Sequence, residues 1–203
     1  MEKNLKTEIT KGKIIKAATE EFALFGFGGA AVNQICRKHG ISKGLVYHNF
    51  GGKEDLYLCC VEEAVNGFIS YMGGKDFGAD FKLYMRERYG FFSANPYYRR
   101  LIFADVTTDS AEFSEKIKEI RSRFDEFNKK VYLRAIDGIK LRKGVSRADA
   151  LEYYSLLQNT LNGYLSGDEA SADNFDFVFN THERNLEKML DFMLYGIAQE
   201  EKQ

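Results

Sequence analysis

Residues 29–56 read Gly-Ala-Ala-Val-Asn-Gln-Ile-Cys-Arg-Lys-His-Gly-Ile-Ser-Lys-Gly-Leu-Val-Tyr-His-Asn-Phe-Gly-Gly-Lys-Glu-Asp-Leu, and this stretch decides the fold. Val32, Ile35 and Cys36 recur at helical spacing, so they predict a short helix with one apolar face. Gly40 suits the position after a helix end, because glycine adopts the left-handed conformation there without strain. The stretch therefore begins with a short helix that ends in a tight turn.

A second short helix is predicted directly after the turn. Ser42 can accept a backbone N–H and so cap a helix over Lys43–Phe50. Val46 and Phe50 stand four residues apart, which places both on the inward face of that helix. A glycine pair then ends it, and a third helix is expected to start at Lys53.

The outer face of the second helix suggests contact with DNA. A helix fits the major groove and reads bases with residues near its N-terminus. Gly44 allows close approach, Leu45 can touch a thymine methyl group, and Lys53 at a helix start can meet a phosphate. The candidate DNA-binding residues are Asn33, Gln34, Ser42, Lys43, Gly44, Leu45, Tyr47, His48 and Lys53.

The same spacing also fits an ordinary pair of helices joined by a glycine turn. Charge favours the DNA interpretation. Residues 1–53 hold nine Lys and Arg against four Asp and Glu, a net +5, whereas the rest of the chain holds 20 against 26, a net −6. Phosphate contacts supply most non-specific affinity for DNA, so a basic head is expected of a DNA-binding protein. The alternative explanation is a solvated, lysine-rich terminus.

A longer ordered pattern extends over residues 13–62. Its residues are Ile14, Ile15, Ala17, Ala18, Phe22, Gly26, Phe27, Val32, Ile35, Gly40, Ile41, Ser42, Lys43, Gly44, Tyr47, His48, Phe50, Lys53 and Leu56. This pattern resembles the N-terminal domain of the tetracycline-repressor (TetR) family, and it covers about a quarter of the chain. The resemblance implies an all-α protein, with a three-helix DNA-binding domain over residues 1–53. It also implies a helical domain over residues 54–203 that binds a ligand and dimerises.

Two features depart from the family pattern. The family usually opens the second helix with Thr or Ser, whereas this chain has Ala30 and Ala31, which removes a cap of about 1 kcal/mol. Leu45 stands where the family often has a small residue, and its bulk should change which base step is tolerated. The operator sequence therefore does not follow from the resemblance.

Helical periodicity continues through the rest of the chain, and no strand is expected. The predicted helices are 7–25, 54–72, 80–93, 97–104, 110–139, 147–165 and 175–198. The helix over 110–139 has the clearest pattern, with apolar residues in steps of four and three that predict a seam buried along its length. The seam residues are Phe113, Ile117, Ile120, Phe124, Phe127 and Val131.

The last two predicted helices carry more apolar surface than one chain of this size can cover, since a helix that is apolar all round needs neighbours on all sides. Two such helices from each of two subunits would form a four-helix homodimer interface; packing within one chain is the alternative. A dimer also suits a palindromic operator with half-sites about 34–36 Å apart. The apolar residues are Leu151, Tyr153, Tyr154, Leu156, Leu157, Leu161, Tyr164 and Leu165, then Val178, His182, Leu186, Met189, Leu190, Met193 and Ile197.

The middle of the chain is rich in aromatic residues with a few polar side chains among them. Small-molecule sites are mostly apolar cavities with a few polar anchors, so the pattern and the family resemblance both favour an effector site; ordinary core packing is the alternative. The candidate ligand-binding residues are Tyr84, Arg88, Tyr89, Phe92, Phe103, Tyr154, Gln158 and Asn159.

Little in the sequence suggests catalysis, a metal or a cofactor. The three histidines, His39, His48 and His182, lie far apart, and no His, Cys and carboxylate cluster has the spacing of metal ligands. No nucleophile, base and acid arrangement stands out. We therefore expect no metal, no cofactor and no enzymatic activity.

The expected location is the cytoplasm. Three cysteines form no disulfide framework, which favours a reducing compartment and buried, structural thiols. No signal peptide is recognisable, and no apolar run approaches the ~18 residues that span a bilayer, so no membrane partner is expected.

The hypothesis that best fits these patterns is a homodimeric transcriptional repressor that binds a palindromic DNA operator and is released by a small-molecule effector. The alternative is a DNA-bound structural or interaction protein whose helical body docks a protein partner. A helical enzyme is a third and weaker hypothesis.

Overall fold

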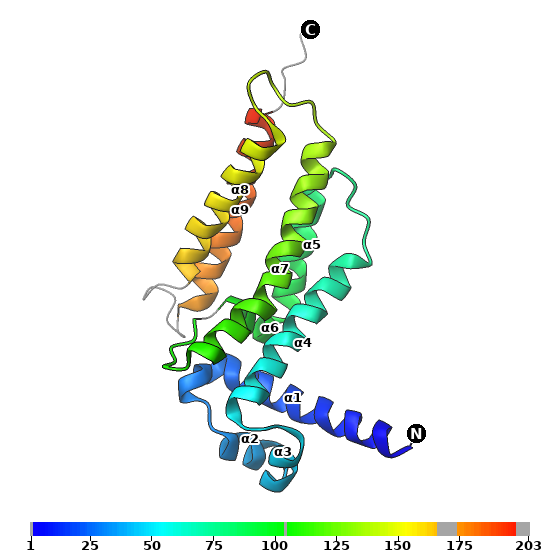
Figure 1. Ribbon diagram of the computed structural model, residues 1–203, viewed down its shortest axis with the longest axis vertical. Helices are drawn as coiled ribbons and strands as arrows, with labels where there is room; N and C mark the ends of the chain where they lie inside the picture. Colours follow the sequence, from blue (N-terminus) through cyan, green and yellow to red (C-terminus); the bar gives the residue numbers. More distant parts are fainter. Residues whose placement is uncertain (1, 104, 166–173, 198–203) are drawn as a thin grey trace. The chain divides into compact units, whose positions relative to one another are not determined.

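The computed structural model describes residues 2–103, 105–165 and 174–197, and these residues form nine helices (Figure 1). The all-α fold predicted from periodicity is confirmed. Ala104 and Ala198, where two predicted helices were expected to end, lie outside the described residues. The helices are α1 (Glu2–Gly29), α2 (Val32–His39), α3 (Lys43–Asn49), α4 (Lys53–Gly73), α5 (Phe81–Ala94), α6 (Pro96–Phe103), α7 (Ala111–Asp137), α8 (Arg147–Leu165) and α9 (Phe175–Ile197).

The chain divides into two compact units. The first unit contains the residues up to Phe68 together with Asn95–Phe124, and the second contains Ile69–Ala94 together with the residues from Asp125 onward. Helices α4 and α7 therefore each supply their N-terminal part to the first unit and their C-terminal part to the second.

Aromatic residues of α1, α4 and α7 meet in the core of the first unit. Phe22 of α1 meets Tyr57 of α4 edge to face, with ring centroids 5.0 Å apart. The helical path of α1 is interrupted at Gly26, whose φ of 67° is available to glycine without strain. Beyond this break, the ring of Phe27 lies 4.7 Å from that of Phe113. These aromatic contacts thus pack α1 against α4 and α7.

The three cysteines are free. Cys36 and Cys59 are half-buried, whereas Cys60 is buried in the first unit and lies 3.6 Å from the carbonyl oxygen of Ile15. Burial raises the pKa of the Cys60 thiol to about 12. This thiol therefore stays protonated near neutral pH, as expected of a structural cysteine.

The predicted seam of α7 is largely confirmed. Phe113, Ile117, Phe124 and Val131 are buried, whereas Ile120 and Phe127 are half-buried. In the second unit the residue after Val131, Tyr132, is also buried, and its ring stacks on that of Tyr154 of α8 at 4.2 Å between centroids. Most buried residues of that unit come from α5, α7, α8 and α9, and Met72 at the end of α4 and Phe77 before α5 are buried as well.

Candidate nucleic-acid interface

Helix α2 has the ends that its sequence predicts. Val32 and Ile35 are buried, and Gly40 takes the left-handed conformation with φ 64° and ψ 28°. The N–H of Gly40 donates to the carbonyl oxygen of Cys36 and closes the helix. At the other end Ala31 occupies the cap position and accepts no hydrogen bond with its side chain, so the departure noted in the sequence leaves this helix start without a side-chain cap.

Helix α3 is capped and anchored locally. The Ser42 hydroxyl accepts the N–H of Leu45 at 3.2 Å, as the sequence predicts for a cap. Val46 of α3 and Phe50, the extended residue directly after the helix, are 1% and 4% exposed, so they anchor α3 in the core. At the other end, the Asn49 amide donates to the Leu45 carbonyl at 2.8 Å.

Burial of the inward face leaves most other side chains of α3 exposed, and Asn49 at its end is half-buried. Leu45 and Tyr47 are 39% and 49% exposed, so both large side chains are accessible to a partner. The Lys43 ammonium lies 5.8 Å from the centroid of the Tyr47 ring, so one charge is held beside an aromatic surface. The other predicted DNA-contacting residues of this region are exposed as well, namely Asn33, Gln34, Ser42, Lys43, Gly44 and His48.

Gly44 leaves open space at the start of α3. A Cβ built at this position would meet no atom of the chain within 4 Å. The glycine is therefore not required by packing within the protein. A requirement for close approach by another molecule would explain it.

Lys53 is placed differently from the other candidates. It is half-buried, its ammonium lies 4.7 Å from the centroid of the Phe27 ring, and it donates to the carbonyl oxygen of Gly28 at 3.4 Å. An ammonium group has three donors, so this contact leaves capacity for a phosphate. Lys53 thus connects the start of α4 to the end of α1.

Not all positive charge in this region is available to a partner. The Lys38 ammonium of α2 lies 2.6 Å from a carboxylate oxygen of Glu20 in α1, and His39 lies 3.8 Å from the other oxygen. The hydrogen bond from Lys38 holds the pKa of Glu20 below its usual value. This contact ties α2 to α1 through Lys38.

The predicted ligand-binding residues are not brought together into one cavity. Tyr84, Arg88, Phe92 and Tyr154 are buried in the second unit and Gln158 is half-buried there, whereas Tyr89 and Asn159 are exposed. Phe103 belongs to the first unit, where its ring lies 5.5 Å from that of Phe124. The buried members of the set form core rather than lining an open space.

Arg88 makes a buried ion pair that the sequence did not indicate. Its guanidinium donates two hydrogen bonds to the Glu183 carboxylate, at 2.8 and 2.9 Å, and a third to the Asn128 side-chain oxygen at 3.0 Å. The Tyr84 hydroxyl donates to the same Asn128 oxygen, and His182 Nδ1 lies 3.1 Å from Glu183. Burial opposes the charge on Glu183, but Arg88 outweighs it and lowers the pKa of this carboxyl to about 2.

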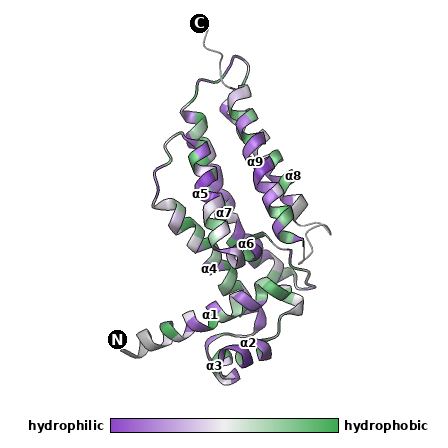
Figure 2. Cartoon of the chain, turned by 180° about the vertical axis from the view of Figure 1, so that it is seen from behind, coloured by the Kyte–Doolittle hydropathy of each residue, from purple (hydrophilic) through white to green (hydrophobic). Residues whose placement is uncertain are grey.

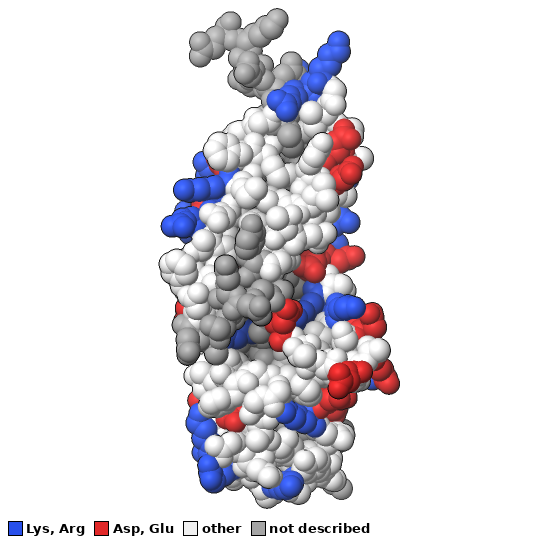
Figure 3. All heavy atoms as spheres, turned by 90° about the vertical axis from the view of Figure 1, so that its left-hand side faces the viewer, with Lys and Arg blue, Asp and Glu red and all other residues white. Residues whose placement is uncertain are grey.

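The outer surface of α8 and α9 is strongly apolar. Leu156 is 54% exposed and Phe192 is 76% exposed, and between them runs a groove of about 430 Å³. Figure 2 shows green, hydrophobic residues along both helices, and Figure 3 shows a broad uncharged area on this face with charged residues toward its edges. The side chains of Tyr164, Leu165 and Ile197 lie outside the described part of the chain. The groove residues are Ala150, Tyr153, Leu156, Leu157, Thr160, Met189, Phe192 and Met193.

Two other kinds of site are not found within the described residues. None of the helices in this part of the chain is long and apolar enough to cross a membrane. The same residues contain no group of three or more His, Cys, Asp or Glu that could hold a metal ion.

The segment that contains α2 and α3 matches a known family model. Residues 14–60 match the model described as bacterial regulatory proteins, tetR family. The transcriptional repressor AcnR of Corynebacterium efficiens is 28% identical over 166 residues, which cover 77% of this chain and 80% of the repressor. The transcriptional regulator LmrA of Bacillus subtilis is 42% identical over 67 residues, which cover 32% of this chain and only 34% of that regulator.

Solved structures share the fold along nearly the whole chain. The transcriptional regulator FadR of Bacillus subtilis, solved in complex with stearoyl-CoA, aligns with a TM-score of 0.65 at 18% identity and covers 91% of this chain and 98% of its own. NalD, a repressor of a multidrug efflux pump in Pseudomonas aeruginosa, aligns with a TM-score of 0.61 at 18% identity and covers 97% and 99%. Both similarities extend well beyond the residues that the family model matches.

Proposed function

Since the chain is a member of the TetR family of bacterial transcriptional regulators, we propose that it is a homodimeric repressor that a small-molecule effector releases from a palindromic operator. In this proposal residues 1–53 carry the operator contacts, and residues 54–203 carry the effector and dimer contacts. The protein would act in the cytoplasm, where its DNA is.

The observation that carries the DNA contacts is the division of α3 into two faces. Val46 and Phe50 are buried, whereas Leu45 and Tyr47 remain exposed beside Lys43. A helix that presents donors and an apolar side chain near its N-terminus has what the major groove requires. We therefore propose that Leu45 contacts bases and that Lys43, Tyr47 and the other exposed candidates mainly contact phosphates.

The apolar groove of α8 and α9 supports a dimer. Exposed apolar surface of this kind marks an interaction site, and two copies of the chain could cover it by pairing the same face across a twofold axis. Two copies would bring two heads to two operator half-sites about one helical turn apart.

Response to an effector is supported by the relatives. FadR was solved with stearoyl-CoA, and AcnR and NalD are repressors. An effector releases DNA only if it binds one conformation of the body better than the other, because differential affinity is what moves the equilibrium. The comparisons do not favour the alternative of a body that docks a protein partner.

Selection of genomic DNA fragments by the purified protein tests the proposal. Wild type should recover one palindrome, and Tyr47→Ala should weaken binding to all sequences because it removes a phosphate contact. Leu45→Ala should instead change the preferred sequence. Equal losses on operator and random DNA for Leu45→Ala would remove its base-reading role, and salt-sensitive binding without an enriched site would contradict the repressor proposal.

Replacing Gly44 by Ala should separate folding from DNA binding. Alanine is the better helix former and the added Cβ meets open space, so the free energy of unfolding should rise by up to about 1 kcal/mol. If the backbone of α3 lies against DNA, operator affinity should fall about tenfold, because the added Cβ holds the backbone away from the DNA. Thermal melting and operator titration measure the two effects, and an unchanged affinity would show that Gly44 does not approach the DNA.

A further inference from the structure

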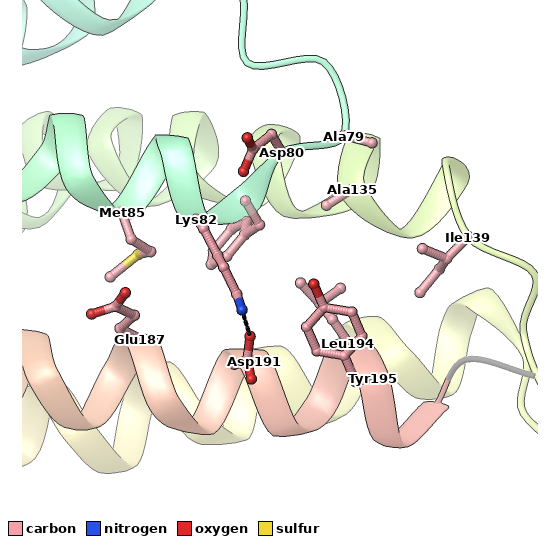
Figure 4. A pocket seen from close by; sticks show the side chains of 11 residues that line it. Ala79, Asp80, Lys82, Met85, Ala135, Ile139, Glu187, Asp191, Leu194 and Tyr195 are labelled. Atoms are coloured by element: carbon pink, nitrogen blue, oxygen red, sulfur yellow. Dashed lines mark ion pairs between the residues drawn. The ribbon is translucent and has the colours of Figure 1, made fainter. Parts of the chain in front are cut away.

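The second unit contains a cavity that the predicted ligand-binding residues do not line. It has a volume of about 340 Å³ and lies between α5, α9 and the end of α7 (Figure 4). Residues just before α5 and just after α7 also line it. This volume lies within the range of small-molecule sites, which runs from about 300 to 1,000 Å³. The lining residues are Ala79, Asp80, Phe81, Lys82, Met85, Ala135, Ile139, Glu187, Asp191, Leu194 and Tyr195.

Part of the cavity wall is apolar. Phe81 and Met85 of α5 are 8% and 3% exposed, and Leu194 of α9 is 8% exposed. Ala135 and Ile139 add small and branched apolar groups on the side of α7. The part of a ligand that lies against these residues should therefore be apolar, since a polar group there would lose its water without gaining hydrogen bonds.

One edge of the cavity already holds an ammonium group. Lys82 reaches from α5 toward α9, where its Nζ lies 3.1 Å from an Asp191 carboxylate oxygen and 5.3 Å from the centroid of the Tyr195 ring (Figure 4). A carboxylate and an aromatic face are the two groups that recognise organic cations. Lys82 is 64% exposed, so its long side chain can swing into solvent and give up this place.

The lining also carries more negative than positive charge. Asp80 caps α5 by accepting the N–H of Leu83 at 2.8 Å, and Asp191 pairs with Lys82. Glu187 makes no ion pair within the described part of the chain. The hydrogen bond to Asp191 is the main cause that raises the pKa of Lys82, and the charge of Glu187 contributes to the same shift. A ligand cation that displaced Lys82 would thus meet two carboxylates.

We propose that this cavity binds a hydrophobic amine or quaternary ammonium compound. The cationic head takes the place of the Lys82 ammonium between Asp191, Glu187 and Tyr195. The apolar body lies between α5 and α9 on Phe81, Met85 and Leu194. Such a compound would be the effector of the proposed repressor. Binding of the cation does not depend on the proposed function, whereas release of DNA by the cation does.

An anionic ligand is the competing possibility, because an adjoining groove of about 580 Å³ includes Arg86 and Arg184. The two ligand classes predict opposite effects for Lys82. An anion would lose a favourable charge when Lys82 is removed, whereas a cation would lose a competitor and gain affinity.

The test measures binding to the full-length protein by isothermal titration below the micelle concentration of each probe. Decyltrimethylammonium should bind more tightly than decanoate or decanol, which share its chain. Glu187→Gln and Asp191→Asn should each weaken the cation by about tenfold, whereas Lys82→Met should strengthen it. Glu126→Gln, which removes an exposed carboxylate of α7 outside the cavity, should change nothing.

Three results would overturn the proposal. Decanoate could bind more tightly than decyltrimethylammonium, Lys82→Met could bind the cation more weakly than wild type, or Glu126→Gln could lose as much cation affinity as Glu187→Gln. Thermal melting of each variant without probe shows that a lost affinity is not lost folding. Operator DNA is then titrated with and without the cation. A protein that selects no operator would refute the proposed function while the cation-binding result stands by itself.

Discussion

Replacing Glu183 by Gln is expected to lower the free energy of unfolding by about 3–5 kcal/mol, because the change leaves the Arg88 guanidinium charged and buried without its partner. Both side chains are nearly inaccessible, at 2% and 3% exposed, and two hydrogen bonds join them. Gln can keep one acceptor for Arg88 but brings no charge. Urea unfolding at a fixed protein concentration measures the loss, since a dimer's apparent stability depends on concentration.

Two controls separate the buried charge from general disturbance. Asp191→Asn breaks the ion pair to Lys82, whose side chains are 64% and 38% exposed, and should cost less than about 1 kcal/mol. The double variant Arg88→Met with Glu183→Leu removes both buried charges and should recover much of the loss. A cost for Glu183→Gln no greater than that for Asp191→Asn would show that the buried pair does not hold the second unit together.

The same pair predicts how stability changes in acid. The pKa of Glu183 is about 2 in the folded protein and 4.5 in its unperturbed state, so the folded state favours the ionised carboxylate. Its contribution is fully present above about pH 4.5 and is lost as the pH falls toward 2. Stability of wild type should therefore fall more steeply than that of Glu183→Gln across this window.

The N-terminal head could be predicted from the sequence because its determinants are local. The Ser42 cap lies three residues from the N–H that it accepts. The helix predicted over Lys43–Phe50 ends at Asn49, and Phe50 follows it in an extended conformation, but Val46 and Phe50 are both buried as their spacing predicts. Gly40 marks the turn by its own conformational freedom. The helix predicted over 147–165 is likewise confirmed as α8. Its apolar pattern is a property of this one segment of the chain.

The interior of the body could not be predicted in the same way because its contacts join distant residues. Arg88 and Glu183 are 95 positions apart, and no local pattern indicates that pairing. The predicted ligand set also contained neighbours such as Arg88 and Tyr89, which a helix turns by about 100° from each other. Only Arg88 of these two is buried. An aromatic-rich sequence thus indicated a core but not where space remains within it.

Replacing Phe192 by Asp should convert the protein to a monomer and reduce operator affinity by about 10²- to 10⁴-fold, because two linked heads bind far more tightly than one. Phe192 is 76% exposed in the single chain and lines the apolar groove of α8 and α9. A buried charge at the proposed interface is costly, yet within one chain the new carboxylate faces water. The helical content of the variant should therefore be unchanged.

Phe177→Asp is the matched control, since Phe177 lies on the same helix, is 70% exposed and does not line the groove. Sedimentation equilibrium gives the oligomeric state of both variants, and titration of the selected operator gives their affinities. If Phe192→Asp remained dimeric and bound the operator normally, the groove would not be the interface and the exposed apolar residues of α8 and α9 would need another partner. A monomer that still bound the full operator with wild-type affinity would instead contradict the idea that two linked heads provide the affinity.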